Sequence, residues 1–348
     1  MAIRFAVVGV GHIGRRHAAL IAAQPGAELV GLCDLRERTA LPWPVGVPRN
    51  TAYFRTLTGL LETIPFDVAC ICTPNGLHAS QAVQCLEAGR HVVVEKPMAL
   101  TAADCDRLIA TAERQQLRVF GVMQNRYSPA AAWLKHVVSR GALGEILQVH
   151  LDCFWNRDYR YYRTATGGPH PWHGDPELDG GVLFTQFAHF IDLLCWTIGT
   201  PRITHARFAN QTHGALHPFA DTGMVHFELP GGGLGSLNFS TVIFDRNFES
   251  TFTVIGRRGT VKLGGQYMNE LRYCHVQGLP PPQLSPASPP NQYGPYQGSA
   301  ANHHFVIANV VEVLSERAAV ATTAEEGRQV VATIAAIYAA AAGRSANL

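Results

Sequence analysis

The sequence predicts an α/β protein in two parts: an N-terminal Rossmann-type, doubly wound parallel sheet and a C-terminal α+β domain with a large, mostly antiparallel sheet. Three observations support this prediction. Apolar strand-like and helix-like segments alternate over the first 125 residues, as they do in parallel sheets. A glycine-rich turn follows the first of these strands. After residue 200, strand-like segments follow one another with short turns between them, which indicates antiparallel pairing.

Length and composition set limits on the class of protein. At 348 residues the chain fits two domains, expected over 1–125 and 126–348, with a C-terminal helix able to pack back on the first. Hydrophobic residues make up 47% of the sequence and can fill sizeable cores. The formal net charge of +2 is too small to indicate nucleic acid or an anionic membrane as the main partner. Eight cysteines without disulfide-scaffold density indicate a reducing, cytoplasmic setting. No apolar run approaches the roughly 20 residues of a membrane span.

A G-x-G-x-x-G motif occupies residues 9–14, directly after the predicted strand Ile3–Val8 and directly before a helical pattern. The first glycine permits the turn, the second lets the backbone approach phosphates, and the third lets the helix pack closely on the strand. Backbone N–H groups at the helix N-terminus then favour a dinucleotide pyrophosphate. The alternative is a glycine turn with a purely structural role. We expect the cofactor to contact Gly9, Gly11, His12, Ile13 and Gly14.

Asp34 lies at the end of the second predicted strand, Glu28–Leu32. A carboxylate at this place accepts hydrogen bonds from the adenosine ribose hydroxyls and repels a 2′-phosphate, so NAD is favoured over NADP. Arg36 and Arg38 complicate this preference, because an arginine there can pair with the extra phosphate. Alternatively, Asp34 only caps the following turn.

Polar residues follow the other predicted strands of the first half, over 67–72, 91–95 and 118–122. The carboxyl ends of parallel strands meet at the sheet edge where doubly wound folds bind their ligands. Lys96 is the most informative of these residues, because an ammonium beside a nicotinamide can stabilise an alkoxide. Its alternative role is that of a solvated surface charge. We expect this edge to carry the cofactor-binding residues Thr73, Asn75, His78, Glu95, Lys96, Gln124 and Arg126.

A polar stripe occurs in the apolar segment 179–198 of the second half. If this segment is wound as an α-helix at 100° per residue, Thr185, His189 and Asp192 share one face. Single buried histidines are usually satisfied core residues, so spacing alone does not establish a catalytic role. The opposite face carries Phe187, Phe190, Ile191, Leu194 and Ile198.

The loop over 154–163 is aromatic and basic. Its arginines, Arg157, Arg160 and Arg163, suit phosphate or carboxylate recognition, although the loop could also simply cover the sheet. Nearby, His170, His173 and Asp175, with His189, can be considered as metal ligands. Their spacing lacks a firm zinc pattern and hydride transfer to NAD needs no metal, so we expect none.

The combined motifs resemble the glucose-fructose oxidoreductase/inositol dehydrogenase (Gfo/Idh/MocA) family of NAD(P)-dependent sugar dehydrogenases. The motifs are the glycine loop, Cys-Thr-Pro-Asn-x-x-His at 72–78, Glu-Lys-Pro at 95–97 and Gln-Asn-Arg-Tyr at 124–127. The resemblance implies that Lys96 is catalytic and that His189 is the acid/base. Thr185 stands where the family commonly has aspartate or asparagine, so it can offer only a hydrogen bond.

Three further stretches, over 178–192, over 264–269 and over 289–294 with 299–303, resemble a subgroup of the family, the bacterial UDP-N-acetylglucosaminuronate 3-dehydrogenases of lipopolysaccharide O-antigen synthesis. This resemblance implies NAD-dependent oxidation of a sugar 3-hydroxyl, in some relatives with NADH recycled by 2-oxoglutarate, and a homo-oligomer, expected to be a tetramer assembled through the antiparallel sheet. Another sugar or inositol dehydrogenase of the family is the alternative, and a non-catalytic dinucleotide-sensing regulator is a second. The expected substrate-binding residues are Tyr127, Arg157, Arg160, Arg163 and Thr185.

Overall fold

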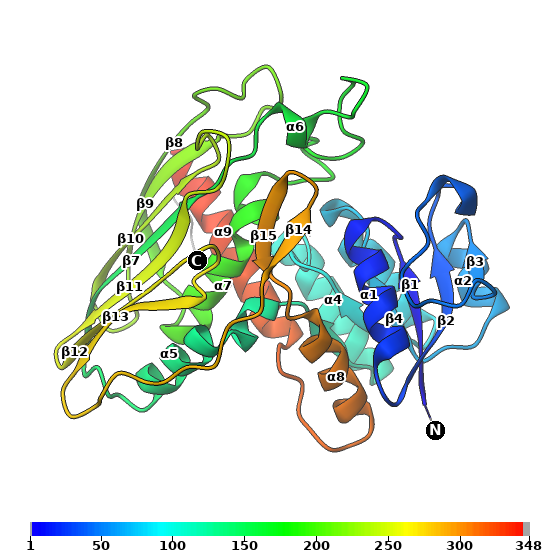
Figure 1. Ribbon diagram of the computed structural model, residues 1–348, viewed down its shortest axis with the longest axis horizontal. Helices are drawn as coiled ribbons and strands as arrows, with labels where there is room; N and C mark the ends of the chain where they lie inside the picture. Colours follow the sequence, from blue (N-terminus) through cyan, green and yellow to red (C-terminus); the bar gives the residue numbers. More distant parts are fainter. Residues whose placement is uncertain (1, 344–348) are drawn as a thin grey trace. The chain divides into compact units, whose positions relative to one another are not determined.

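The computed structural model describes residues 2–343 (Figure 1). These residues form two compact units, described separately below. The first unit comprises the chain up to Met123 together with His303–Val331. The second comprises Gln124–Asn302 together with the chain from Ala332 onwards. The last helix, α9 (Ala324–Ala341), therefore contributes residues to both units.

The first unit contains a six-stranded sheet with the order β3-β2-β1-β4-β5-β6, and all its pairings are parallel. This is the order expected of a doubly wound dinucleotide-binding sheet, and it confirms the predicted fold class. The order in which strands are added to the sheet reverses between β1 and β4, and doubly wound folds bind their ligands at the carboxyl ends of the strands at this point. The strands are β1 (Ile3–Val8), β2 (Ala27–Cys33), β3 (Ala52–Phe54), β4 (Val68–Ile71), β5 (His91–Val94) and β6 (Val119–Gly121).

Helices connect these strands, and local sequence explains their ends. Thr101 accepts a hydrogen bond from the backbone N–H of Asp104 and caps α4, a role in which threonine is common. Cys105, Leu108 and Ala112 of that helix are buried, in agreement with their helical spacing. The first-unit helices are α1 (His12–Ala23), η1 (Arg38–Ala40), α2 (Leu57–Thr63), η2 (Asn75–Leu77), α3 (His78–Glu87), α4 (Ala102–Gln115) and α8 (His303–Leu314).

The second unit contains a seven-stranded sheet with the order β13-β12-β11-β7-β10-β9-β8. Only β7 and β10 pair in parallel, so the predicted mostly antiparallel sheet is confirmed. The strands are β7 (Ile146–Phe154), β8 (Arg202–Ala209), β9 (Thr222–Glu228), β10 (Leu234–Ser240), β11 (Glu249–Gly256), β12 (Gly259–Gly264) and β13 (Glu270–Val276). The other elements are η3 (Gln124–Tyr127), α5 (Pro129–Ser139), α6 (Tyr159–Tyr162), η4 (Leu183–Phe187), α7 (Ala188–Thr197) and a hairpin of β14 (Pro290–Tyr293) and β15 (Tyr296–Ala300).

One face of this sheet is covered by helices and the other is open. Phe187 packs against Trp155 and against Phe239 of β10, which places η4 and α7 on the inner face (Figure 1). Along β9, Val225 and Phe227 are buried whereas Met224 is 59% exposed, as alternation along a strand requires. The inner face therefore forms the core of the second unit.

The helix that carries the polar stripe differs from the prediction. Leu183–Phe187 form a π-helix, η4, and only Ala188–Thr197 are regular α-helix. A wider turn changes the angle between successive side chains, so the spacing of 100° per residue holds for His189 and Asp192 but not for Thr185. The expectation of one continuous α-helical stripe was wrong in that part.

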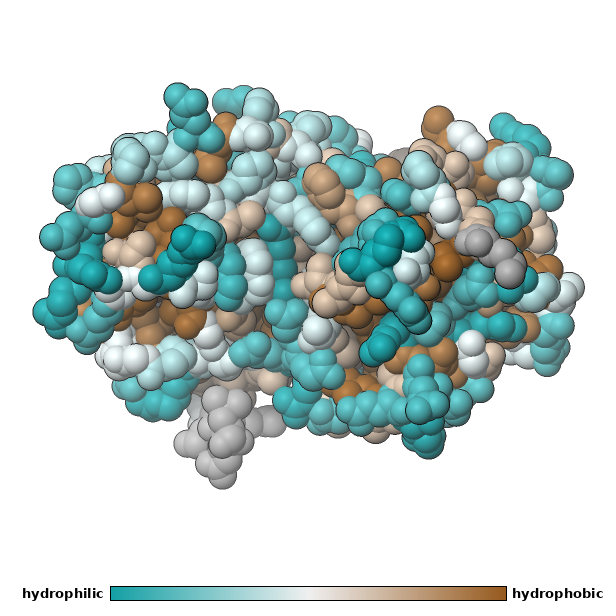
Figure 2. All heavy atoms as spheres, turned by 90° about the horizontal axis from the view of Figure 1, so that it is seen from below, coloured by the Kyte–Doolittle hydropathy of each residue, from teal (hydrophilic) through white to brown (hydrophobic). Residues whose placement is uncertain are grey.

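Among the described helices, none is long and apolar enough to cross a membrane. On the face drawn in Figure 2, hydrophobic residues are interspersed with hydrophilic ones. All eight cysteines are free thiols.

Candidate active site

The glycine loop has the geometry that a pyrophosphate requires. Gly9 has a φ of +87°, and a Cβ there would lie 2.6 Å from the carbonyl oxygen of Cys72. A Cβ on Gly14 would lie 1.7 Å from the carbonyl oxygen of Gly9. Both glycines are thus required by the protein's own backbone. Gly11 is different, because a Cβ there would meet nothing within 4 Å. The open space over Gly11 fits the close approach of a phosphate.

The start of α1 is suited to an anion. Gly11 is its N-cap residue, no side chain caps the helix, and its first turn carries no acidic residue. His12 and Ile13 form this first turn. The N–H groups of a helix N-terminus attract negative charge through the helix dipole, so the loop and α1 together fit the pyrophosphate of a dinucleotide.

Asp34 connects the glycine loop to the end of β2. Its Oδ2 accepts a 2.8 Å hydrogen bond from the backbone N–H of Val10, and Arg36 donates to both carboxylate oxygens. Burial raises the pKa of Asp34, but the hydrogen bonds from Arg36 and Val10 outweigh it and hold the pKa below its ordinary value. The carboxylate is therefore charged at neutral pH, as discrimination against a 2′-phosphate requires.

Replacing Asp34 with serine should shift cofactor preference toward NADP. The substitution removes the carboxylate that repels a 2′-phosphate and frees Arg36 to bind it, while a serine hydroxyl can still accept from Val10. We expect the ratio of NADPH to NADH affinity to rise about tenfold or more. Fluorescence titration of both reduced cofactors measures this ratio. Asp106→Ser, an exposed change, is the control; an unchanged ratio in Asp34→Ser would remove Asp34 from cofactor selection.

The end of β4 is fixed to the segment after β5 by His78. The Nδ1 atom of its buried ring lies 2.7 Å from the carbonyl oxygen of Pro97, and Nε2 lies 2.8 Å from that of Thr73. The hydroxyl of Thr73 donates to Gln81 at 2.7 Å. Asn75 is also buried, at the start of η2. These predicted cofactor residues thus lie together at the carboxyl edge of the parallel sheet.

Lys96 directly follows β5 at the same edge. Glu95 is buried, and its Oε2 accepts a 3.2 Å hydrogen bond from the backbone N–H of Lys96. The Lys96–Pro97 peptide bond is cis. The side chain of Lys96 is half-buried, in the first unit.

In the second unit, η4 and the loop before it hold Thr185 against Asp179. The Thr185 hydroxyl hydrogen-bonds to the buried Asp179 carboxylate. Asp179 also accepts a 2.9 Å bond from the backbone N–H of Gly174. At Gly181, φ is +112° and a Cβ would lie 2.5 Å from the hydroxyl of Tyr338, so only glycine permits this turn. Sequence reasoning did not identify Asp179, although it directly precedes the Gly-Gly pair that marks the motif.

His189 is 2% exposed, on the first turn of α7. The Gln124 side-chain amide lies 3.0 Å from His189 Nε2 and 3.2 Å from the Ser299 hydroxyl. In this orientation of the Gln124 amide, its nitrogen donates to His189 Nε2, so Nε2 carries a lone pair. Sequence reasoning named Gln124 as a cofactor residue and did not name Ser299 as a site residue. The signal for Ser299 was its place in a stretch that resembles the subgroup.

Arg126 and Asp192 form a buried ion pair. Arg126 donates from Nε at 2.9 Å and from Nη2 at 2.6 Å to the two oxygens of Asp192, and the exposed fractions of the side chains are 5% and 0%. The Arg126 guanidinium also lies 5.2 Å from the centre of the Trp196 ring. The structure therefore places Asp192, one member of the polar stripe, against η3. Arg126, a predicted cofactor residue, is held by this pair.

The three arginines of the aromatic loop are engaged within the second unit. Arg157 is buried; it donates to Gln186 at 2.7 Å and lies against aromatic rings. Arg160 pairs with Asp158 at 2.7 Å, and Arg163 donates to the carbonyl oxygen of Ala215 at 3.1 Å. A phosphate would have to compete with these contacts.

Tyr127 and the loop histidines complete the set of predicted residues. Tyr127 is half-buried at the end of η3, and burial raises the pKa of its phenol. The ring of His173 stacks on His170 at 3.8 Å and on Tyr161 at 4.0 Å. Among the described residues, potential metal ligands converge at a different place, where His17, Glu95 and His303 have ligand atoms within 4.8 Å of one another.

Comparison with known proteins identifies the family. The profile of the GFO_IDH_MocA oxidoreductase family, NAD-binding Rossmann fold, matches residues 3–122, and the GFO/IDH/MocA C-terminal domain matches residues 132–262. The chain belongs to the Gfo/Idh/MocA family. It is an NAD-dependent sugar dehydrogenase of that family, and the suspected resemblance is confirmed.

Two solved structures are similar over nearly the whole chain. The WlbA dehydrogenase from Bordetella pertussis, in complex with NADH and UDP-GlcNAcA, is 30% identical, with a TM-score of 0.84 over 98% of this chain and 97% of that one. The WlbA dehydrogenase from Chromobacterium violaceum, with the same two ligands, is 30% identical, with a TM-score of 0.84 over 99% and 95%.

Curated Gfo/Idh/MocA relatives include inositol dehydrogenases. Inositol 2-dehydrogenase of Salmonella typhimurium is 25% identical over 271 residues, which cover 76% of this chain and 74% of that protein. Inositol 2-dehydrogenase 1 of Saccharopolyspora erythraea is 29% identical over 288 residues, which cover 80% and 79%.

Proposed function

We propose that this protein oxidises the 3-hydroxyl of UDP-N-acetylglucosaminuronate (UDP-GlcNAcA) to a ketone, with NAD as the hydride acceptor. The observation that carries the proposal is the likeness to two dehydrogenases crystallised with NADH and UDP-GlcNAcA. That likeness extends over 98% or more of this chain at 30% identity. Such an activity would belong to the synthesis of lipopolysaccharide O-antigen sugars.

The chemistry requires a proton acceptor and a group that stabilises negative charge. Bound NAD supplies the nicotinamide carbon that takes the hydride from C3 of the sugar. His189 accepts the proton of the 3-hydroxyl, for which the substrate must replace the Gln124 amide at Nε2. Lys96 stabilises the negative charge that develops on the sugar oxygen. Thr185 cannot act as a carboxylate base, and it offers a hydrogen bond oriented by Asp179.

The arginines of the aromatic loop supply positive charge for the diphosphate and the sugar carboxylate. Arg163 is the best placed for this task, because its described contact is a single backbone carbonyl in an exposed setting. Arg157 and Arg160 shape the loop through their contacts with Gln186 and Asp158. Tyr127 is proposed as a further substrate contact.

The reaction can be tested directly by product analysis. Incubation with NAD and UDP-GlcNAcA should give NADH, measured by its absorbance, and a sugar nucleotide that has lost two hydrogen atoms, detected by mass spectrometry. Adding 2-oxoglutarate tests whether NADH is recycled in place, in which case more than one product molecule forms per bound cofactor. His189→Asn should reduce turnover about 10²-fold or more while NADH still binds. A wild-type protein that gives no keto sugar would contradict the proposed substrate.

The curated relatives favour one alternative, the oxidation of inositol or another free polyol. Free polyols lack the diphosphate that the basic loop would bind. A parallel assay with myo-inositol separates the two candidates.

We also propose a homotetramer assembled through the open face of the seven-stranded sheet, where Met224 and Leu234 are about 60% exposed. Light scattering after size-exclusion chromatography measures the oligomer.

A further inference from the structure

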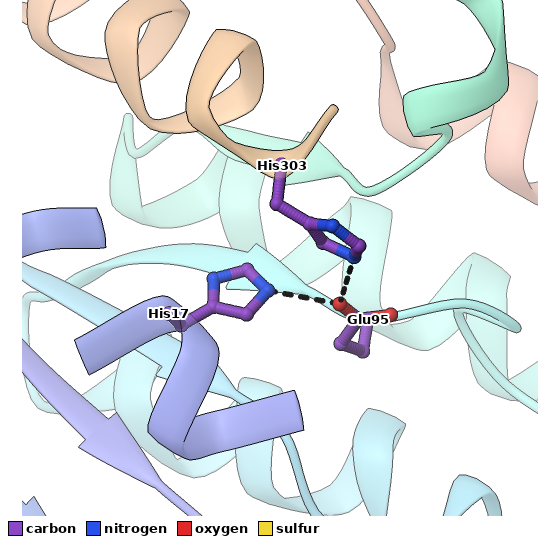
Figure 3. A group of neighbouring side chains, drawn as sticks. All are labelled: His17, Glu95 and His303. Atoms are coloured by element: carbon purple, nitrogen blue, oxygen red, sulfur yellow. Dashed lines mark hydrogen bonds and ion pairs between the residues drawn. The ribbon is translucent and has the colours of Figure 1, made fainter. Parts of the chain in front are cut away.

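The carboxylate of Glu95 and the imidazoles of His17 and His303 point toward one another (Figure 3). Glu95 directly precedes Lys96 in the chain. Glu95 Oε1 lies 2.8 Å from His17 Nε2 and 3.5 Å from His303 Nε2. His17 comes from α1, His303 from the first residue of α8, and Glu95 directly follows β5. All three residues are 5% exposed or less. Two helices that are far apart in the sequence thus bind the same carboxylate.

The proton positions follow from the outer ring atoms. Neither the Nδ1 atom of His17 nor that of His303 has a hydrogen-bond partner among the described residues. If each ring carries a proton on Nε2, both N–H groups point at Glu95. A buried Nδ1 lone pair without a donor then costs less than a buried N–H without an acceptor would. A metal bound to both Nε2 atoms would move both protons to Nδ1, where each would be a buried donor without an acceptor. The geometry therefore favours a hydrogen-bonded carboxylate over a metal site.

The charges agree with this arrangement. Burial raises the pKa of the Glu95 carboxyl, but the hydrogen bonds from His17 and His303 outweigh it and hold the pKa well below its ordinary value. Burial lowers the pKa of His303, in keeping with a neutral imidazole. The carboxylate is an anion that hydrogen-bonds to His17 and to the Lys96 backbone N–H, and His303 Nε2 lies 3.5 Å from it as an ion-pair contact.

A third histidine holds the other side of Lys96. The ring of His78 lies between the carbonyl oxygens of Pro97 and Thr73, and its N–H donates to one of them. Buried histidines therefore contact both neighbours of Lys96: the side chain of Glu95 before it and the carbonyl group of Pro97 after it. Apolar side chains would join the same elements at a lower desolvation cost, so packing alone does not account for three buried histidines and a buried carboxylate at this place.

We propose that His17, His303 and His78 are positioning residues that hold the segment Glu95-Lys96-Pro97 so that Lys96 keeps the geometry needed for turnover. The three histidines are called the histidine clamp. This inference rests on the proposed role of Lys96 in the dehydrogenase reaction. His17 and His303 act on Lys96 through Glu95, and His78 acts through Pro97.

Two substitutions at His303 test the histidine clamp. His303→Leu removes the N–H group at constant size, whereas His303→Gln keeps an N–H donor near the position of Nε2. We expect His303→Leu to lower kcat about tenfold or more with an unchanged KM for NAD, and His303→Gln to restore most of the loss. The matched control is His304→Leu, an exposed neighbour on the same helix, with wild-type kinetics.

A second measurement needs no substrate. The Lys96 amide donates to Glu95, so its hydrogen exchange reports directly on the clamp. Mass spectrometry of peptides that span residues 92–99 should show exchange about tenfold faster in His303→Leu than in wild type or His304→Leu. If wild type does not oxidise UDP-GlcNAcA, the proposed function fails, but this exchange comparison still decides the clamp.

Three results would overturn the inference. One is wild-type kcat and amide exchange in His303→Leu. Another is a kcat in His303→Gln as low as in His303→Leu, with equal losses of thermal stability, because that indicates a structural role only. The third is a stoichiometric metal in the purified protein whose removal by EDTA abolishes turnover. If His303→Leu does not fold, the same readouts are applied to His78→Phe and His78→Gln.

Discussion

Replacing Lys96 with alanine is expected to reduce kcat about 10²-fold or more while NADH binds with nearly unchanged Kd. Removing a preorganised cation from a developing oxyanion costs a few kcal/mol of transition-state stabilisation. The pyrophosphate contacts reside in the glycine loop and α1, which this substitution leaves intact. Stopped-flow or steady-state NADH formation gives kcat, and fluorescence titration gives the Kd.

The matched control is Lys262→Ala, because Lys262 is half-buried on β12 of the other sheet. It should keep wild-type kcat. Lys96→Arg is informative as well: it retains the charge but changes the geometry, so partial activity would indicate an electrostatic role. Near-normal turnover in Lys96→Ala would remove Lys96 from the mechanism and, with it, the basis of the clamp's functional role.

Replacing Asp192 with alanine is expected to lower the free energy of unfolding by about 3–5 kcal/mol. The substitution leaves the Arg126 guanidinium buried without the carboxylate that it contacts at 2.6 and 2.9 Å. Urea denaturation followed by tryptophan fluorescence measures the change, with Trp196 lying close to Arg126.

A pair of controls separates the buried charge from a simple loss of contact. Glu145→Ala breaks the exposed pair with Arg257 and should change stability by less than about 1 kcal/mol. The double variant Arg126→Met/Asp192→Leu removes both charges and should regain much of the loss, because no unpaired charge remains. An equally large loss in the double variant would show that packing, and not the unpaired charge, accounts for the effect.

The predictable parts of the fold are those in which local pattern and burial agree. The apolar run before the glycine loop became β1 over the predicted residues, and a similar apolar run after Gly144 forms β7. Thr101 caps α4 through its side chain. These segments lie inside sheets or cap helices, so the hydrophobic period and the capping chemistry act in the same direction.

The strands that sequence reasoning did not predict, β3, β8 and β13, all lie at sheet edges. An edge strand has one paired side and buries fewer side chains, which weakens the alternation that would reveal it. The hairpin of β14 and β15 is similarly hard to recognise, because it follows a proline-rich stretch that is typical of loops. The π-helix at Leu183–Phe187 also escaped prediction, because a period of 3.6 is assumed when only sequence is available.

By itself, the sequence determined that a dinucleotide binds to a doubly wound sheet, because the glycine spacing, the preceding strand and the following helix are all local. It also indicated Lys96 and His189 as the candidates for chemistry. Only the tertiary structure decided what surrounds the candidate site residues. Gln124 and Ser299 lie at His189, Asp179 lies at Thr185, and the histidine clamp holds Glu95 next to Lys96. His17, Glu95 and His303 lie far apart along the chain, and a contact between such residues arises only when α1, β5 and α8 pack together.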